Sequence, residues 1–192
     1  MSAVRMDGKA LSAKVRGSIL AETEELKKKG VTPGLAVIIV GNDPASEIYV
    51  RNKERACEQC GFYSEKNALP EETSQEELLG LIAQLNESPQ ISGILCQMPV
   101  PKHISEQAVI DAIDPRKDVD AFHPVNVGKI MVGNFDFVPC TPAGVMELLD
   151  EYQIDPKGKE CVVVGRSNIV GKPMAMLLLH RHGTVTILSL IH

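Results

Sequence analysis

Short apolar runs and longer helical stripes alternate along the chain, and this alternation predicts an α/β protein. Residues 35–40 and 162–164 are continuously apolar and rich in β-branched side chains, which is typical of strands buried on both faces. Between such runs apolar positions recur at helical spacing, as in residues 78–85. Strands that alternate with helices in this order favour parallel sheets.

Start and stop signals bound several of these elements. Asp43 and Pro44 are typical of a helix N-terminus, and Gly61 is typical of the end of that helix. Residues 114–142 are rich in Gly, Pro, Asn and Asp and are predicted to be one long irregular segment. The expected helices are residues 11–26, 44–60, 78–85, 104–113, 141–152 and 173–179, and the expected strands are residues 35–41, 62–68, 93–97, 161–164 and 185–188.

Composition narrows the classes of function. The 192 residues carry a net charge of −5 and show no basic stripe interleaved with aromatic residues, which argues against a nucleic-acid partner. No apolar run approaches the length of a membrane span, and no signal peptide is evident. Five scattered cysteines suit a reducing cytoplasm. Cys57-x-x-Cys60 lies in an expected helix with no second pair, and the histidines show no ligand spacing, so we expect no metal.

The segment VVVGRSNIVGKP at residues 162–173 carries the clearest functional signal. A buried strand breaks at Gly165 and enters a helix after Gly171, as where a doubly wound sheet receives phosphates at a helix N-terminus. Arg166 could grip a phosphate, and residues 185–188 end without an acidic residue for a ribose hydroxyl, so NADP is favoured over NAD. A plain tight turn remains the alternative.

Three further positions carry candidate chemistry. Tyr49 and Lys53 are four residues apart on an expected helix and so share a face. Gln97 ends an expected strand, where open α/β sheets contact ligands. Asp118 and Asp120 place two carboxylates on one side of an extended segment, where a carboxylate can accept two N–H bonds from a pyrimidinone edge. A surface lysine, a simple strand exit and loop capping are the structural alternatives.

Together these segments resemble the bifunctional methylenetetrahydrofolate dehydrogenase/cyclohydrolase family. The resemblance rests on five motifs in the family's order, which cover nearly the whole chain: YVRNK at 49–53, QMPVP at 97–101, KDVD at 117–120, PCTP at 139–142 and VVGRSNIVGKP at 163–173. It implies a three-layer α/β catalytic domain at residues 1–140, a Rossmann-type NADP-binding domain beginning at residues 141–192, and folate in the cleft between them. It also implies a cytoplasmic homodimer formed through the second domain.

The resemblance further implies the reaction and the residue roles. NADP⁺ takes a hydride from 5,10-methylenetetrahydrofolate, and water then opens the methenyl product to 10-formyltetrahydrofolate. A protonated lysine would be repelled by the methenyl cation, so the site should favour neutral Lys53 as base or relay. The resemblance also implies that Gln97 orients Lys53. It implies that folate is bound by Tyr49, Met98 and Pro99, and that Asp120 holds the pterin edge. The residues implied to bind the cofactor are Thr141, Gly165, Arg166, Ser167 and Gly171.

The chain departs from the family pattern at several points. Ala121 replaces the usual glycine, where its methyl group could crowd the turn or force a different φ, and Met98 replaces a leucine. After residues 185–187 the family continues for about another third of its length, whereas this chain ends at His192. We therefore expect a truncated or frameshifted product with poor NADP-dependent activity. A two-domain dehydrogenase of the shikimate or amino-acid type and a non-catalytic folate-binding fragment remain alternatives; the Tyr-x-x-x-Lys and Gln-x-Pro motifs favour folate.

Overall fold

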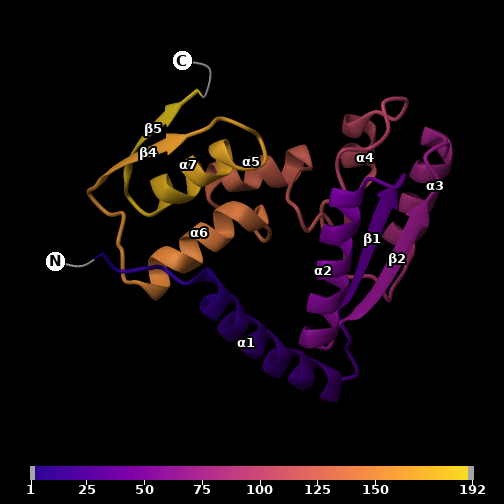
Figure 1. The fold of residues 1–192 in the computed structure, drawn as a ribbon, viewed down its shortest axis with the longest axis horizontal. Helices are drawn as coiled ribbons and strands as arrows, with labels where there is room; N and C mark the ends of the chain where they lie inside the picture. Colours follow the sequence, from indigo (N-terminus) through magenta and orange to yellow (C-terminus); the bar gives the residue numbers. More distant parts are fainter. Residues whose placement is uncertain (1–2, 190–192) are drawn as a thin grey trace. The chain divides into compact units, whose positions relative to one another are not determined.

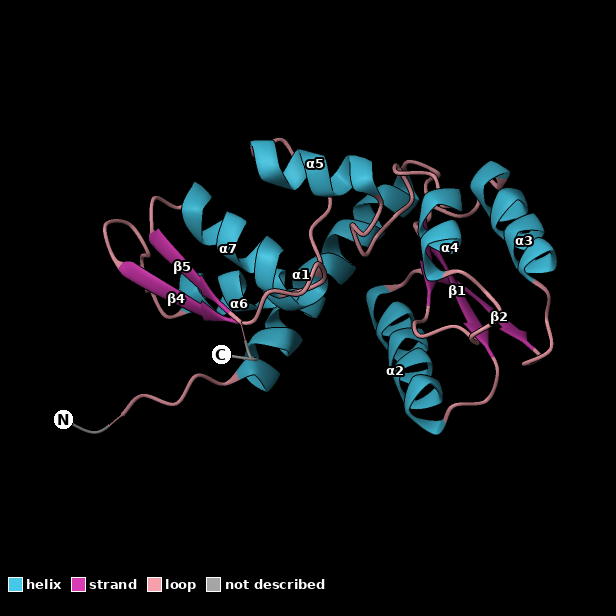
Figure 2. Cartoon of the chain, turned by 90° about the horizontal axis from the view of Figure 1, so that it is seen from above, coloured by secondary structure: helices cyan, strands magenta, loops and turns pink. Residues whose placement is uncertain are grey.

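The computed structural model describes residues 3–189, which form two compact units. The first comprises residues 13–119, and the second comprises residues 120–189 together with residues 3–12. Helix α1 (Gly8–Lys28) contributes to both units. Figure 1 shows the order of the elements and Figure 2 their types.

The first unit is built on a parallel sheet of three strands. Strands β1 (Gly34–Val40), β2 (Tyr63–Leu69) and β3 (Gly93–Cys96) lie in the order β2-β1-β3. The central strand β1 is apolar along its length because both of its faces are covered, which is the pattern its sequence predicted. The predicted parallel α/β arrangement is confirmed.

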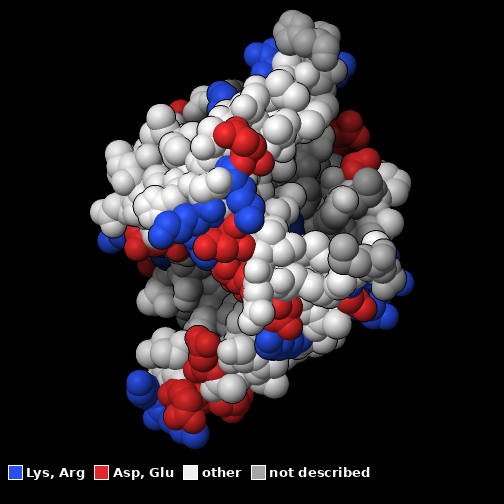
Figure 3. All heavy atoms as spheres, turned by 90° about the vertical axis from the view of Figure 1, so that its left-hand side faces the viewer, with Lys and Arg blue, Asp and Glu red and all other residues white. Residues whose placement is uncertain are grey.

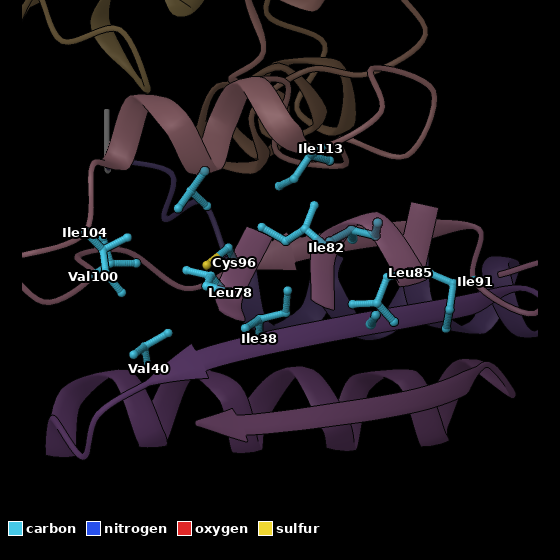
Figure 4. Close-up of a cluster of buried hydrophobic side chains, with 13 residues drawn as sticks. Ile38, Val40, Leu78, Ile82, Leu85, Ile91, Cys96, Val100, Ile104 and Ile113 are labelled. Carbon is cyan, nitrogen blue, oxygen red and sulfur yellow. The ribbon is translucent and has the colours of Figure 1, made fainter. Parts of the chain in front are cut away.

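Helices cover both faces of this sheet and make three layers. On one face Ile38 packs with Leu78 and Ile82 of α3 (Gln75–Glu87), and the same cluster extends to α4 (Glu106–Ala112) (Figure 4). On the other face Val37 and Ile39 pack against Val50 of α2 (Pro44–Cys60). Successive residues of β1 therefore anchor helices on opposite sides.

Helix α2 has the bounds that its sequence predicts. The Asp43 carboxylate accepts a 2.8 Å hydrogen bond from the Ser46 amide, and Pro44 occupies the first turn. Gly61 closes the helix with a left-handed φ of 73°, and the amide of Phe62 then donates to the carbonyl of Cys57. Both ends depend on local chemistry, so the sequence alone located them.

The second unit contains a two-stranded parallel sheet. Strands β4 (Glu160–Val164) and β5 (Thr184–Leu188) are joined by α7 (Gly171–His180), which packs on one face of the sheet. Helix α6 (Cys140–Glu151) adds Met146 to the same cluster. The opposite face leaves Val162 and Val164 60% and 64% exposed. The strand–helix–strand order of a Rossmann-type half is confirmed.

The prediction of one irregular segment at residues 114–142 was wrong, because helix α5 (Pro124–Val132) lies within it. The His123 Nδ1 atom accepts a hydrogen bond from the Val125 amide, and Gly133 ends the helix at a φ of 81°. Pro124 and Gly133 had been interpreted as loop residues, whereas they begin and end a helix of nine residues.

Charge is mixed rather than segregated on the face drawn in Figure 3, where acidic and basic side chains intersperse. Among residues 3–189 no helix is both long enough and apolar enough to cross a bilayer.

Candidate functional site

The Lys53 amine donates a 2.9 Å hydrogen bond to Oε1 of Gln97, across 44 residues of sequence. Lys53 lies in the third turn of α2, and Gln97 directly follows β3. The backbone N–H of Gln97 donates a 2.8 Å hydrogen bond to the carbonyl of Ile38, which fixes the Gln97 backbone beside the central strand. Two of the predicted site residues therefore meet at the carboxyl edge of the first sheet.

The carboxamide of Gln97 is held at both ends. Its Nε2 atom donates a 2.9 Å hydrogen bond to the carbonyl of Met98, so Oε1 is the atom presented to Lys53. The following turn is anchored in the core by Val100 and Ile104, which are both buried. The Gln97 oxygen therefore holds the Lys53 amine in a fixed direction.

Tyr49 lies one helical turn before Lys53 and is 62% exposed. Its neighbour Val50 is fully buried and seats the helix on the sheet, which directs Tyr49 away from the core. The phenol is therefore accessible for stacking on a flat ligand.

The two aspartates of the KDVD motif have different environments. Asp118 is 4% exposed and pairs with Ile94 in a parallel β-bridge, which makes it part of the sheet edge. Asp120 is only partly buried. The spacing alone does not distinguish the two carboxylates, whereas the structure leaves Asp120, the one that the resemblance selected, more accessible than Asp118.

Ala121 adopts a left-handed φ of 55°, and its side chain is almost fully buried. The backbone therefore keeps a conformation that favours glycine although a methyl group is present.

The backbone geometry of the β4–α7 turn explains why both positions are glycine. Gly165 has a φ of 141°, and a Cβ atom on Gly171 would lie 2.2 Å from the carbonyl oxygen of Gly165. The Ser167 Oγ atom accepts hydrogen bonds of 3.1 Å and 3.3 Å from the amides of Val170 and Gly171. The turn is therefore folded tightly onto the N-terminus of α7.

This geometry changes what each residue of the turn can offer a phosphate. Because the Gly171 amide already donates to Ser167, Gly171 does not offer a hydrogen-bond donor to a phosphate. It allows the phosphate to approach the backbone closely. Ser167 keeps its hydroxyl proton for a ligand, and the Arg166 side chain is exposed. Thr141 is exposed in the first turn of α6. Sequence motifs named these residues but could not reveal the hydrogen bonds that Ser167 accepts from the amides of Val170 and Gly171.

Among residues 3–189 no group of three or more His, Cys, Asp or Glu side chains is arranged to hold a metal ion. The described cysteines form no disulfide. Burial, as the main cause, raises the pKa of the Cys57 thiol, so this cysteine is a poor nucleophile.

The fold and these side chains define a class of α/β protein. Its first unit is a parallel sheet that carries the candidate catalytic residues, and its second unit contains a strand, a glycine turn and a helix of the kind that binds nucleotides. Family models match both parts: the tetrahydrofolate dehydrogenase/cyclohydrolase catalytic domain over residues 6–120, and the NAD(P)-binding domain of the same family over residues 139–191. The chain belongs to the tetrahydrofolate dehydrogenase/cyclohydrolase family.

Individual relatives agree. The bifunctional protein FolD of Acetivibrio thermocellus is 64% identical over 187 residues, which cover 97% of this chain and 66% of the relative. The crystal structure of FolD from Campylobacter jejuni matches with a TM-score of 0.94 at 47% identity, over 97% of this chain and 67% of that one.

The Trypanosoma brucei enzyme, solved with NADP cofactor and an inhibitor, matches with a TM-score of 0.93 at 38% identity, over 98% of this chain and 65% of that one. The chain thus spans about two thirds of the length of these relatives. The family match decides against a dehydrogenase of the shikimate or amino-acid type.

Proposed function

We propose that the protein oxidises 5,10-methylenetetrahydrofolate to 5,10-methenyltetrahydrofolate with NADP and hydrolyses the product to 10-formyltetrahydrofolate. The observation that carries the proposal is the 2.9 Å hydrogen bond between Lys53 and Gln97 at the carboxyl edge of the first sheet. An amine there can take a proton from the attacking water, and a neutral acceptor holds that amine in place.

In the hydrolytic step, water adds to the methenyl carbon and one of its protons passes to the Lys53 amine. Gln97 Oε1 fixes the direction of that amine. Returning the proton to the departing ring nitrogen breaks the carbon–nitrogen bond, and release of the remaining hydroxyl proton to solvent leaves the formyl group. Tyr49 stacks on the folate, Met98 and Pro99 also bind it, and Asp120 accepts hydrogen bonds from the pterin edge. These assignments rest on the motifs and on the exposure of Tyr49.

NADP supplies the hydride acceptor for the oxidative step, which requires mainly alignment of two carbon atoms. Arg166 and the Ser167 hydroxyl bind the phosphates of NADP. Gly165 and Gly171 allow these phosphates to approach the backbone closely, and Thr141 of α6 also binds the cofactor. The absence of an acidic side chain in β5 favours the 2′-phosphate form. A structural relative solved with NADP supports this choice.

The proposal assigns the catalytic role to residues 1–140 and cofactor binding to the part that begins at residue 141. It includes a homodimer formed through the second unit, since the face of β4 that carries Val162 and Val164 is apolar and exposed. It also places the protein in the cytoplasm, which suits cysteines that form no disulfide.

Substitution of Lys53 tests the hydrolytic step. Lys53→Met should slow hydrolysis of methenyltetrahydrofolate by about 100-fold or more, because proton transfer by a positioned group contributes on that scale. Arg55→Met, an exposed position on the same helix, is the matched control and should keep the rate. An unchanged rate in Lys53→Met would refute the role of the amine.

Thermal stability separates this proposal from a non-catalytic folate-binding module. A ligand that binds only the folded state raises the melting temperature. We expect 5-formyltetrahydrofolate to raise it and NADP to raise it further. A response to the folate together with no turnover of either substrate would favour the binding module.

A further inference from the structure

The side chain of Lys117 reaches away from its own segment to the end of a helix. Its amine donates hydrogen bonds of 3.0 Å to the carbonyl of Leu85 and 2.8 Å to the carbonyl of Ser88. These carbonyls lie in the last turn and at the C-cap of α3, where the helix dipole favours a cation. Lys117 therefore ties the KDVD motif to α3.

The backbone of the same motif is fixed to the sheet. The Ile94 amide donates a 2.7 Å hydrogen bond to the Lys117 carbonyl, and Ile94 pairs with Asp118 in a parallel bridge. Val119 packs against the cluster on the α2 face of the sheet, and a Cβ atom on Gly93 would lie 2.3 Å from its Cγ1 atom. Residues 117–119 are thus fixed beside β3 by a single β-bridge, one backbone hydrogen bond and the packing of Val119.

Asp120 is the next residue after this bridged segment. Its backbone position is set on one side by the segment that Lys117 anchors, and on the other by the left-handed turn at Ala121. A carboxylate that binds two parallel donors needs accurate placement, since displacement by about 1 Å weakens such contacts strongly. The anchor and the ligand-binding residue lie only three positions apart in the sequence.

We propose that Lys117 is a positioning residue for folate recognition, acting by holding the bridged segment that Asp120 follows. The inference rests on the proposed function, which assigns Asp120 to the pterin edge. Lys117 itself contacts no substrate in this scheme, because its amine is directed to the carbonyls of Leu85 and Ser88.

The test measures affinity for two probes. The first is 5-formyltetrahydrofolate, which contains the pterin, and the second is p-aminobenzoylglutamate, which lacks it. Lys117→Met should bind the folate about tenfold more weakly, a loss of the size expected for a displaced contact. Its affinity for the fragment should not change. Lys117→Arg, which can still donate to two carbonyls, should restore the affinity for the folate.

Ser74→Ala is the matched control for stability. Ser74 caps the opposite end of α3, where its hydroxyl accepts a 3.2 Å bond from the Glu77 amide, so its loss destabilises the same helix without touching Lys117. Ser74→Ala should keep the affinity for the folate. Equal weakening in Ser74→Ala and Lys117→Met would show a merely structural role and overturn the inference.

A double substitution identifies the residue through which Lys117 acts. In Asp120→Asn the further change Lys117→Met should weaken folate binding by less than twofold, because the positioned carboxylate is already gone. Full additivity overturns the inference. If the unsubstituted protein binds 5-formyltetrahydrofolate but Lys117→Met binds equally well, only the inference fails. If the unsubstituted protein does not bind it, the proposed function fails as well.

Discussion

Lys53 and Gln97 are joined by a 2.9 Å hydrogen bond although they lie on different elements and 44 residues apart. The bond forms because α2 packs on β1 through Val50, while Gln97 extends the neighbouring strand β3. The position of the amine therefore depends on the Gln97 oxygen as well as on the helix.

Gln97→Met should slow hydrolysis of methenyltetrahydrofolate by about tenfold or more, since the amine loses the acceptor that orients it. The initial rate of loss of the methenyl compound measures this. Gln59→Met is the matched control, because Gln59 is exposed on α2 and its carboxamide oxygen accepts a 2.8 Å hydrogen bond from Arg16. Equal rates in the two variants would contradict the orienting role of Gln97.

Gly171→Ala should destabilise the second unit by about 2 kcal/mol or more, because the new Cβ atom would meet backbone atoms of Gly165 and Arg166. Denaturant unfolding followed by circular dichroism measures the change. Gly144→Ala is the control, since this glycine lies in α6 with no atom within 4 Å of its Cβ position. There alanine should stabilise by about 0.5–1 kcal/mol. A tolerated Gly171→Ala would show that the turn can relax.

Asp114 gives a contribution to stability that depends on pH. Hydrogen bonds from the Arg116 side chain, as the main cause, lower the pKa of the Asp114 carboxyl from 3.8 to about 2. A carboxyl whose pKa is lower in the folded state stabilises it above its unfolded pKa, and this stabilisation is lost as the pH falls from about 4 to about 2. Because Arg116 is 86% exposed, solvent screening reduces the contribution to about 1 kcal/mol at neutral pH.

Asp114→Asn should therefore lose about 1 kcal/mol of stability at pH 6, and its difference from the unsubstituted protein should shrink towards pH 2.5. The amide oxygen can still accept from the Arg116 backbone, so the substitution isolates the charge. Urea midpoints across this range measure the difference. A gap that stays constant down to pH 2.5 would contradict the linkage to this carboxyl.

Gln153→Gly should stabilise the second unit by about 1 kcal/mol, because Gln153 has a left-handed φ of 56° in the position after Tyr152, the C-cap of α6. The reciprocal control is Gly158→Ala, where φ is 70° and the Cβ position is open, so only backbone strain opposes the methyl group. It should destabilise by about 1 kcal/mol. Melting curves of the two variants should shift in opposite directions, and shifts of the same sign would show that contacts dominate over backbone conformation.

Local chemistry explains which elements could be predicted. Asp43 and Gly61 bound α2 by hydrogen bonds within four or five residues, and the apolar run of β1 reports a strand covered on both faces. Helix α5 was missed because His123, Pro124 and Gly133 are residue types that also occur in loops. Only the structure shows that the residues between them form a helix. Signals that begin a helix and signals that begin a turn use the same residue types.

The sequence by itself determined the parallel α/β class and the strand–glycine–helix turn after β4, since each depends on periodicity or on neighbouring side chains, and the resemblance of its motifs to a family named the candidate residues. Only the tertiary structure decided that Gln97 presents its oxygen to Lys53, that Asp118 is buried at the sheet edge while Asp120 is partly exposed, and that Lys117 caps α3. These relationships join residues far apart in the chain, and their geometry is set by how the helices pack on the strands, which no local pattern encodes.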